Sequence, residues 1–226
     1  MISAFTKAIA QLPEREFRRA LCISLGLSLV TFVVLAVVAW WLMGNAGLLD
    51  WPWPLNYVFE AVGWVVFAIL TWFLFPAIVS TFVAFFLEGV ASAVERKHYP
   101  NDPPGQDVPI GRSLLVTANF TLALVLVNVV GLLLYVPLMF FPILSFIMFY
   151  VLNGYLLGRE YFELVALRHL DDEAARAMRR RHSRRIVLAG VVIAFLFTIP
   201  VVNLLTPLIA AAAMVHVFKR ISARPA

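Results

Sequence analysis

Charged residues are scarce in this chain. Only 14% of its 226 residues are Asp, Glu, Lys or Arg, whereas 62% are hydrophobic, and the mean hydropathy is +0.91. Soluble domains are nearer half apolar and a quarter charged, so this composition excludes an ordinary soluble protein. The apolar runs also lack the alternation of apolar and polar residues that is typical of membrane β-strands. Because helices then remain as the way to satisfy the backbone within lipid, we predict an all-α integral membrane protein.

Residues that carry catalysis or hold metals are equally sparse. Cys22 is the single cysteine, so it has no partner for an internal disulfide. The four histidines lie on separate segments without a metal-ligand spacing, and the chain has no nucleophile motif and no phosphate-binding loop. We therefore expect no enzyme, no metal site and no cofactor.

Acidic residues are outnumbered by basic ones, 13 to 18, which gives a net charge of +5 and a pI near 9.7. Nucleic-acid binding is one explanation of such an excess, but neither a stacking pattern nor a recognition helix accompanies it. Basic residues also collect on the cytoplasmic side of membrane proteins and at anionic lipid surfaces. We expect membrane lipids as partners and no nucleic acid.

Four apolar segments stand between charged ones. They cover residues 21–43, 57–87, 113–158 and 186–218. A membrane core about 30 Å thick needs roughly 20 helical residues, so the first two segments predict two long transmembrane helices. The third and fourth segments each carry a pair of prolines near the middle, and prolines break helices. These two segments predict helical hairpins.

The segment 186–218 is too long for one ordinary span and too short for two. Divided between Pro200 and Pro207, it leaves two legs of roughly 24 Å each, which is less than the thickness of the membrane core. We predict a re-entrant hairpin that penetrates only partway. The hairpin 113–158 is long enough to cross or to do likewise. A turn at membrane depth must be covered by protein or face water, which implies an oligomer.

The positions of the cations predict the orientation. All 18 Lys and Arg fall in four blocks outside the apolar segments, and the proline-rich turns have none. The positive-inside rule places these blocks, and with them both termini, in the cytoplasm. We predict an interfacial helix over residues 1–20 and a basic cytoplasmic helix with charge pairs over 159–185. The whole chain, 1–226, is then a single membrane domain.

Several stretches carry a family resemblance. They read FRRALCISLGLSL near the N-terminus, FLEGVASAVERKHYP after the second apolar segment, NGYLLGREYFE at the end of the third, and IPVVNLLTPLIAAA in the fourth. In these stretches the sequence resembles the CysZ-type sulfate permeases of the wider etoposide-induced-protein superfamily. The resemblance covers most of the chain.

The resemblance implies a bacterial inner (plasma) membrane protein with two long transmembrane helices and two helix pairs that penetrate only partway. It further implies a homo-oligomer built from dimers that passes sulfate for cysteine biosynthesis. Two other interpretations stay open. One is a non-transporting membrane scaffold that binds anionic lipid or partner proteins through its basic segment. The other is a permease for another oxyanion, such as sulfite, thiosulfate or selenate.

The family's sulfate-binding motif is similar to Gly-Leu-Arg-Arg, and the matching residues here are Glu16, Phe17, Arg18 and Arg19. The two arginines can hold sulfate through charge-assisted hydrogen bonds, while glutamate in place of glycine puts a repelling carboxylate beside them. Arg112, between a glycine and a serine where the third segment begins, is a further candidate for sulfate binding. Anchoring to lipid headgroups is the alternative role for these arginines.

Uncharged polar residues within the apolar segments are candidates to line a pathway. They are Ser24, Ser28, Asn119, Asn128 and Asn203. Such groups also hold helices together in lipid, which is the alternative role for all of them. Asn203 is favoured for the pathway because it lies at a predicted break at membrane depth, where irregular backbone lines a cavity.

Overall fold

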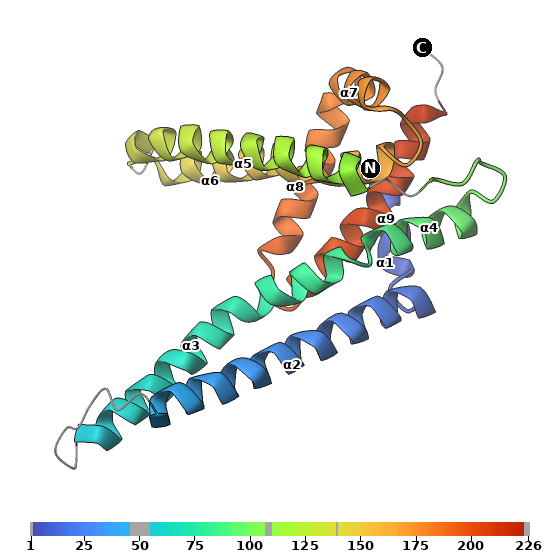
Figure 1. Cartoon of the computed structure of the whole chain (residues 1–226). Helices are drawn as coiled ribbons and strands as arrows, with labels where there is room; N and C mark the ends of the chain where they lie inside the picture. The colour runs from blue at the N-terminus through green and yellow to red at the C-terminus, as the bar shows by residue number, and fades with distance from the viewer. Residues whose placement is uncertain (1, 46–54, 107–109, 139, 224–226) are drawn as a thin grey trace. The chain divides into compact units, whose positions relative to one another are not determined.

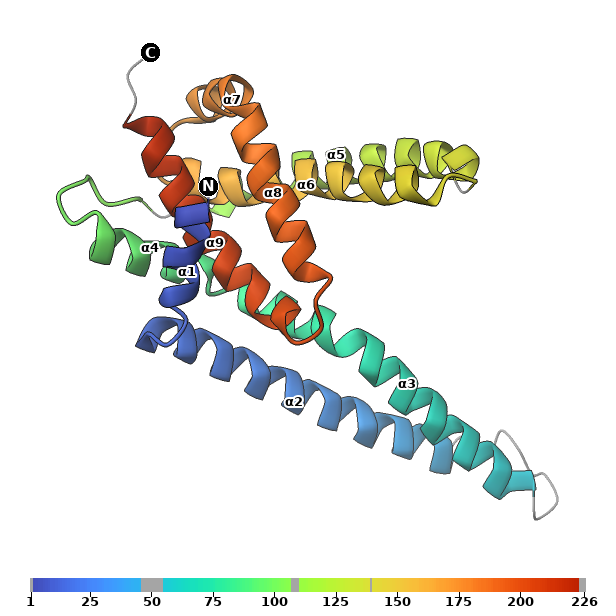
Figure 2. The same cartoon turned by 180° about the vertical axis from the view of Figure 1, so that it is seen from behind.

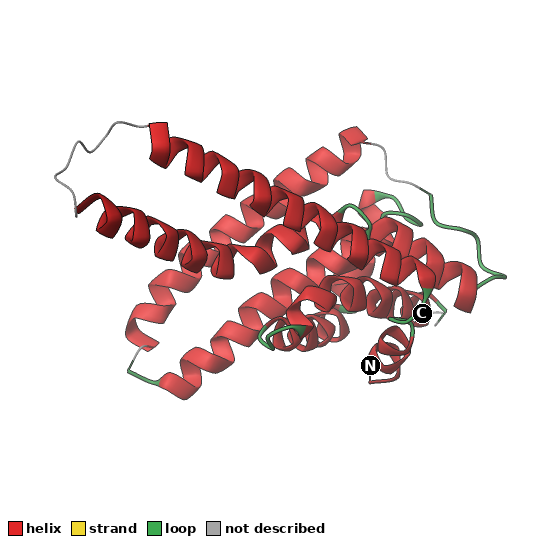
Figure 3. Ribbon diagram, turned by 90° about the horizontal axis from the view of Figure 1, so that it is seen from below, coloured by secondary structure: helices red, strands yellow, loops and turns green. Residues whose placement is uncertain are grey.

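A computed structural model describes residues 2–45, 55–106, 110–138 and 140–223. Within these residues every regular element is an α-helix, which confirms the all-α class (Figure 1, Figure 3). The helices are α1 (Ile2–Ala10), α2 (Arg15–Asn45), α3 (Leu55–Ala84), α4 (Leu87–His98), α5 (Ile110–Leu138), α6 (Pro142–Ala166), α7 (Asp172–Arg181), α8 (Ser183–Phe197) and α9 (Val202–Ser222). The first proline-rich turn, residues 46–54, lies outside the described part of the chain.

The chain divides into two compact units. One, here called the larger unit, contains residues 1–17 and 87–226. The other, here called the helical pair, contains residues 18–86. The boundary at residue 17 falls within the first turn of α2, so this helix starts in the larger unit and continues as part of the helical pair.

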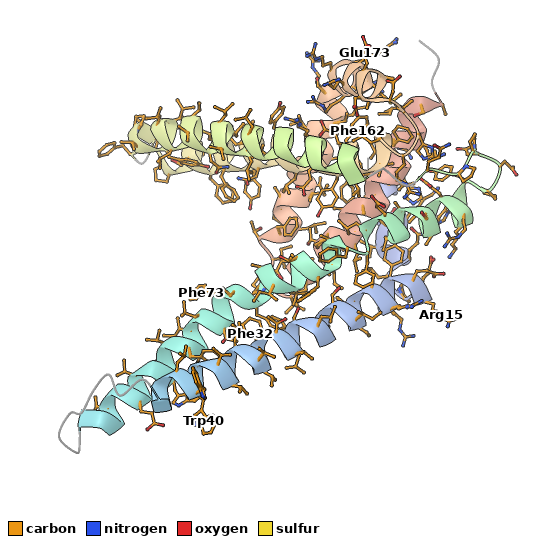
Figure 4. All side chains as sticks on the ribbon, viewed as in Figure 1. Arg15, Phe32, Trp40, Phe73, Phe162 and Glu173 are labelled. Carbon is orange, nitrogen blue, oxygen red and sulfur yellow. The ribbon has the colours of Figure 1, made fainter. Side chains whose placement is uncertain are left out.

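In the helical pair, α2 and α3 lie side by side and run antiparallel (Figures 1 and 2). Phe32 of α2 contacts Phe75 of α3, with ring centroids 5.9 Å apart. Most other large apolar side chains of this unit are exposed, among them Trp40 and Phe73, which project outward in Figure 4. Both helices are long and apolar enough to cross a membrane, so lipid is the natural medium to cover these side chains.

The larger unit is built around α9. Four helices pack against it, α1, α4, α6 and α8, and its residues 206–219 are all buried (Figure 2). A run of four alanines, residues 210–213, lets the neighbouring helices approach closely because each alanine adds only a methyl group. Although α9 is also long and apolar enough to span a membrane, most of its apolar surface contacts protein.

The tightest helix crossing in the larger unit joins α6 to α8 through glycines. Gly154 and Gly158 are spaced i, i+4 on α6, and Gly190 faces them from α8. A Cβ atom added at Gly190 would overlap the carbonyl oxygen of Gly154, and one at Gly158 would meet the carbonyl oxygen of Ile186. Only glycine therefore permits this approach, as in the small-residue crossings that pack membrane helices.

The segment 113–158 forms a hairpin, as predicted. Its legs are α5 and α6, and Pro142 stands at the first position of α6, where proline's missing N–H removes no helical hydrogen bond. α6 continues to Ala166, eight residues past the predicted end at 158, and this extension buries Phe162, Val165 and Ala166. Its 25 residues are enough to cross a membrane.

The segment 186–218 is also a hairpin, but its legs are unequal and its turn is shorter than predicted. The turn covers residues 198–201, where Val201 adopts a positive φ of 67°. Pro207 does not break the chain here; it lies inside α9, one turn after the helix begins. α8 has 15 residues, about 22 Å, whereas α9 has 21 residues, about 31 Å. Partway penetration thus fits α8 by length and does not follow for α9.

The two flanking segments depart from the predicted single helices. Residues 1–20 hold α1 and the start of α2, separated by a turn, and α1 packs on α9 through Ala4, Phe5 and Ala8. Residues 159–185 hold the end of α6, a turn, α7 and the start of α8. The break before α7 is fixed by Asp171, whose side chain accepts a hydrogen bond from the Ala174 N–H at 2.7 Å and caps the new helix.

Candidate functional site

The paired arginines Arg18 and Arg19 lie in the first two turns of α2, and both side chains are exposed. The sequence predicted the first long helix from residue 21, but α2 already begins at Arg15, so both arginines belong to it. Glu16 is exposed in the same first turn. The arginines are accessible to an anion from solution, and they would bind it through their guanidinium groups.

Two of the predicted site residues lie in the part of α5 for which only the backbone is described. Arg112 is in the first turn of α5 and Asn119 is two turns further along. For Arg112, sulfate binding and anchoring to lipid headgroups stay the two predicted roles. For Asn119, they are lining a pathway and holding helices together.

The predicted pathway residues of α2 and α9 are Ser24, Ser28 and Asn203. Ser28 donates a hydrogen bond from its Oγ to the Ser24 carbonyl oxygen at 2.7 Å, and both serines are buried. Asn203 lies in the first turn of α9 and is half-buried. Because Pro207 has no N–H, the Asn203 carbonyl receives no helical hydrogen bond from it, and this carbonyl keeps acceptor capacity.

Asn128 is exposed and lines an open cavity between α5 and α6. The cavity has a volume of about 300 Å³, and its polar lining residues are Asn128 and Tyr135 of α5 and Asn153 of α6. Each asparagine donates one N–H to the carbonyl oxygen four residues earlier, at 2.8 Å in both cases. Each amide therefore keeps a second N–H and its carbonyl oxygen for a ligand.

Asn153 is a residue that the analysis of the sequence did not select, although it stands in the NGYLLGREYFE stretch. Its signal was an uncharged amide in an apolar helix, the same signal that selected Asn128 on the partner helix. Only the antiparallel pairing of α5 with α6 shows that the two amides line one space.

A buried ion-pair network ties α4 to the turn after α6. The Arg168 guanidinium lies 3.3 Å from a Glu95 carboxylate oxygen and donates to the Ser92 hydroxyl at 2.6 Å. The other Glu95 oxygen lies 2.9 Å from Nε2 of His169. Glu95 and Arg168 are almost fully buried, so this network holds the fold together and is closed to a passing anion.

A second polar cluster joins the end of α4 to α9. The Tyr99 hydroxyl is hydrogen-bonded to Nδ1 of His216 at 2.9 Å, and the rings of His98 and His216 lie 5.0 Å apart. Burial lowers the pKa of His98 below 6.5, and the nearby Lys7 and Lys97 lower it further against an opposing effect of Glu14. The two histidines are far apart in the sequence, so no sequence motif indicated that they would be in contact.

These sites offer cations and neutral hydrogen-bond donors. In the part of the chain that the structure describes, no group of three or more His, Cys, Asp or Glu side chains is arranged to hold a metal ion. What the described residues offer is exposed cations on α2 and neutral amide and hydroxyl groups between α5 and α6. Cations attract an anion, and neutral donors solvate one without trapping it.

Comparison with known proteins agrees with this chemistry. No curated protein matches the chain. A family model described as sulfate transporter CysZ/etoposide-induced protein 2.4 matches residues 4–207, which include every helix up to the first turns of α9. The match confirms the family resemblance that the sequence motifs carried. The chain therefore belongs to the family of the sulfate transporter CysZ and etoposide-induced protein 2.4.

Proposed function

We propose that this multi-pass membrane protein is a sulfate permease that admits sulfate across the bacterial inner membrane and supplies cysteine biosynthesis. Family membership supports the transport of sulfate, and helices long enough to span a membrane support its location in one. The specific substrate, the bacterial inner membrane and the link to cysteine biosynthesis are part of the proposal.

The observation that carries the proposal is the cavity between α5 and α6. A permeating sulfate must exchange its hydration shell for other hydrogen-bond donors. Asn128, Asn153 and Tyr135 supply neutral ones in a cavity whose other lining residues are apolar or glycine. A cation at the same place would bind the dianion too tightly for release. Neutral donors allow entry and exit, which favours channel-like passage down a gradient.

The exposed arginines provide the first step of this proposal. Arg18 and Arg19 would concentrate the dianion at the protein surface, and Arg112 would assist from the start of α5. Their contribution is to the rate of encounter, so it would weaken as salt screens their charge.

The assembly forms a further part of the proposal. Away from the cavity, α5 and α6 expose large apolar side chains, including Leu133, Val136 and Phe146. A hairpin that penetrates only partway needs protein around its turn, and a second copy of the chain can provide it. We propose a homo-oligomer built from dimers, with both termini in the cytoplasm.

Uptake into liposomes tests the permease. We expect purified protein, reconstituted into liposomes, to admit radiolabelled sulfate above the rate of empty liposomes. Asn128→Leu combined with Asn153→Leu should reduce that rate by at least tenfold, because the cavity loses its amide donors. Thr81→Val is the matched control, since Thr81 also donates to the carbonyl four residues earlier but lies outside the cavity.

Three results would contradict the proposal or change its terms. Absence of sulfate entry, with protein that elutes as a folded oligomer, would favour the non-transporting scaffold. Unchanged flux in the double asparagine variant would remove the cavity from the pathway. Stronger inhibition by sulfite, thiosulfate or selenate than by unlabelled sulfate would assign the permease to another oxyanion.

A further inference from the structure

α7 and α8 meet at a corner, at His182, beside the last turn of α9 (Figure 2). Residues of all three helices line a pocket there, with a volume of about 510 Å³. We call it the corner pocket, and its lining includes Ala177, Met178, Arg181, His182, Arg185 and Ile221. It lies entirely in the larger unit and is separate from the cavity between α5 and α6.

One side of the corner pocket is cationic. Arg181 and Arg185 flank His182, and no carboxylate is among the lining residues. Burial, followed by the charges of Arg185 and Arg181, lowers the pKa of His182 below 6.5, so this imidazole is neutral near pH 7 and can donate a hydrogen bond. Positive charge is thus gathered here without an internal counter-charge.

Two acidic groups of this region, Glu163 and Asp171, are engaged elsewhere. The Glu163 carboxylate is within 3.0 Å of the Arg159 guanidinium and 3.3 Å of that of Arg179. Asp171 caps the opposite end of α7 by accepting from the Ala174 N–H. The charges of α7 are therefore segregated, with carboxylates where the helix begins and arginines where it ends at the pocket.

The other side of the corner pocket is apolar. Ala174 and Ala177 of α7, Met178 of the same helix and Ile221 of α9 form this wall. A free inorganic anion would gain from the arginines but nothing from the apolar wall. A lipid with an anionic headgroup gains from both, because its phosphate meets the guanidinium groups and its glycerol and upper acyl carbons meet the wall.

We propose that the corner pocket binds the phosphate headgroup of an anionic phospholipid. Arg181 and Arg185 contact the phosphate, His182 donates a further hydrogen bond, and Met178 and Ile221 contact the apolar part of the lipid. The site lies between the two hairpins in sequence, on the side where the cation distribution places the membrane's anionic leaflet. It holds whether or not the protein carries sulfate.

Lipid binding to the purified full-length protein in detergent tests this site. Native mass spectrometry counts bound lipids during titration with dioleoyl phosphatidylglycerol, an anionic lipid, or with zwitterionic dioleoyl phosphatidylcholine. We expect phosphatidylglycerol to bind more tightly. Each arginine near an anionic lipid contributes roughly a fivefold factor, so Arg181→Gln with Arg185→Gln should weaken that binding about 30-fold.

The matched control removes the same charge from the same region. Arg176 and Arg180 are exposed on α7 and do not line the corner pocket. Arg176→Gln with Arg180→Gln should change phosphatidylglycerol binding by less than about threefold. Arg181→Lys with Arg185→Lys keeps the charge, and we expect it to retain most of the binding even if the glutamine variant proves unstable.

Each outcome decides the proposal. Equal losses in the pocket variant and the control variant would mean diffuse attraction to surface charge and would overturn it. Inorganic phosphate or sulfate that displaces the lipid at matched ionic strength would reassign the pocket to a free oxyanion. Selective loss in the pocket variant, without displacement by either ion, would establish a lipid headgroup site.

Discussion

Buried charged residues and histidines that lie far apart in the sequence make the polar contacts between helices in this chain. Glu95, Arg168 and His169 come from two segments and share one network, and His98 meets His216 across more than a hundred residues of chain. Each of these groups is held by a partner from another element. Predictions at this scale therefore concern what happens when one partner is removed or protonated.

Removing the Glu95 carboxylate should destabilise the protein strongly. Glu95→Ala removes the carboxylate that lies 3.3 Å from the buried Arg168 guanidinium and 2.9 Å from Nε2 of His169. We expect a loss of about 3 kcal/mol in the free energy of unfolding, measured by denaturation in mixed micelles. Glu14→Ala is the control. Its partner Lys97 is 56% exposed, so this ion pair is open to solvent on one side and should be worth less than about 1 kcal/mol. Equal effects of the two substitutions would contradict a special role for the buried network.

Acidification should weaken the contact between α4 and α9. Since the pKa of His98 is lowered in the folded protein, the unfolded chain binds the proton more readily, and stability falls as the pH drops below about 6.5. His98→Asn should therefore lose less stability than the native protein between pH 7.5 and pH 5.5, measured by thermal unfolding in detergent. The same drop in both proteins would place the pH dependence on other groups.

The helices themselves follow two packing regimes. α2 and α3 are apolar and exposed, so their side chains are suited to contact with lipid. α9 is also apolar enough to span a membrane, but it is buried within the larger unit, and its alanines suit close contact with other helices. Hydropathy cannot distinguish these regimes, because lipid and a protein interior are both apolar.

Replacing a glycine by alanine should destabilise the protein at the crossing of α6 with α8 but not at a glycine that faces open space. Gly190→Ala places a methyl group against the Gly154 carbonyl oxygen of α6, and backbone must move to make room. We expect a loss of about 3 kcal/mol in the free energy of unfolding. Gly89→Ala in α4 meets open space, so it should be neutral or stabilising by up to about 1 kcal/mol. A small effect at Gly190 would mean that α6 and α8 are less closely packed than described.

For the whole molecule, the cation distribution makes a prediction about topology. With Cys22 replaced by serine, single cysteines at Thr6 and at Ala223 should react with a membrane-impermeant maleimide only after cells are permeabilised. Both sites are exposed, so burial would not mask them. Labelling of about half the copies in intact cells would instead indicate protomers of opposite orientation within the dimer.

The sequence by itself determined the helical class, the places where long apolar segments begin, the hairpin form of the third and fourth segments, and the family. These depend on composition, on proline positions and on local motifs, which act within a few residues of chain. It also predicted Asn128 as a candidate pathway residue, because an amide within an apolar segment can be recognised without knowing what packs against it.

Only the tertiary structure decided which apolar helix is core and which is exposed, where the segment 159–185 breaks, and which polar residues share a space. The cavity that pairs Asn128 with Asn153, the corner pocket and the Glu95 network each join side chains from different helices. The physical reason is that hydropathy and periodicity describe a helix alone, whereas burial and hydrogen-bond partners are set by what packs against it.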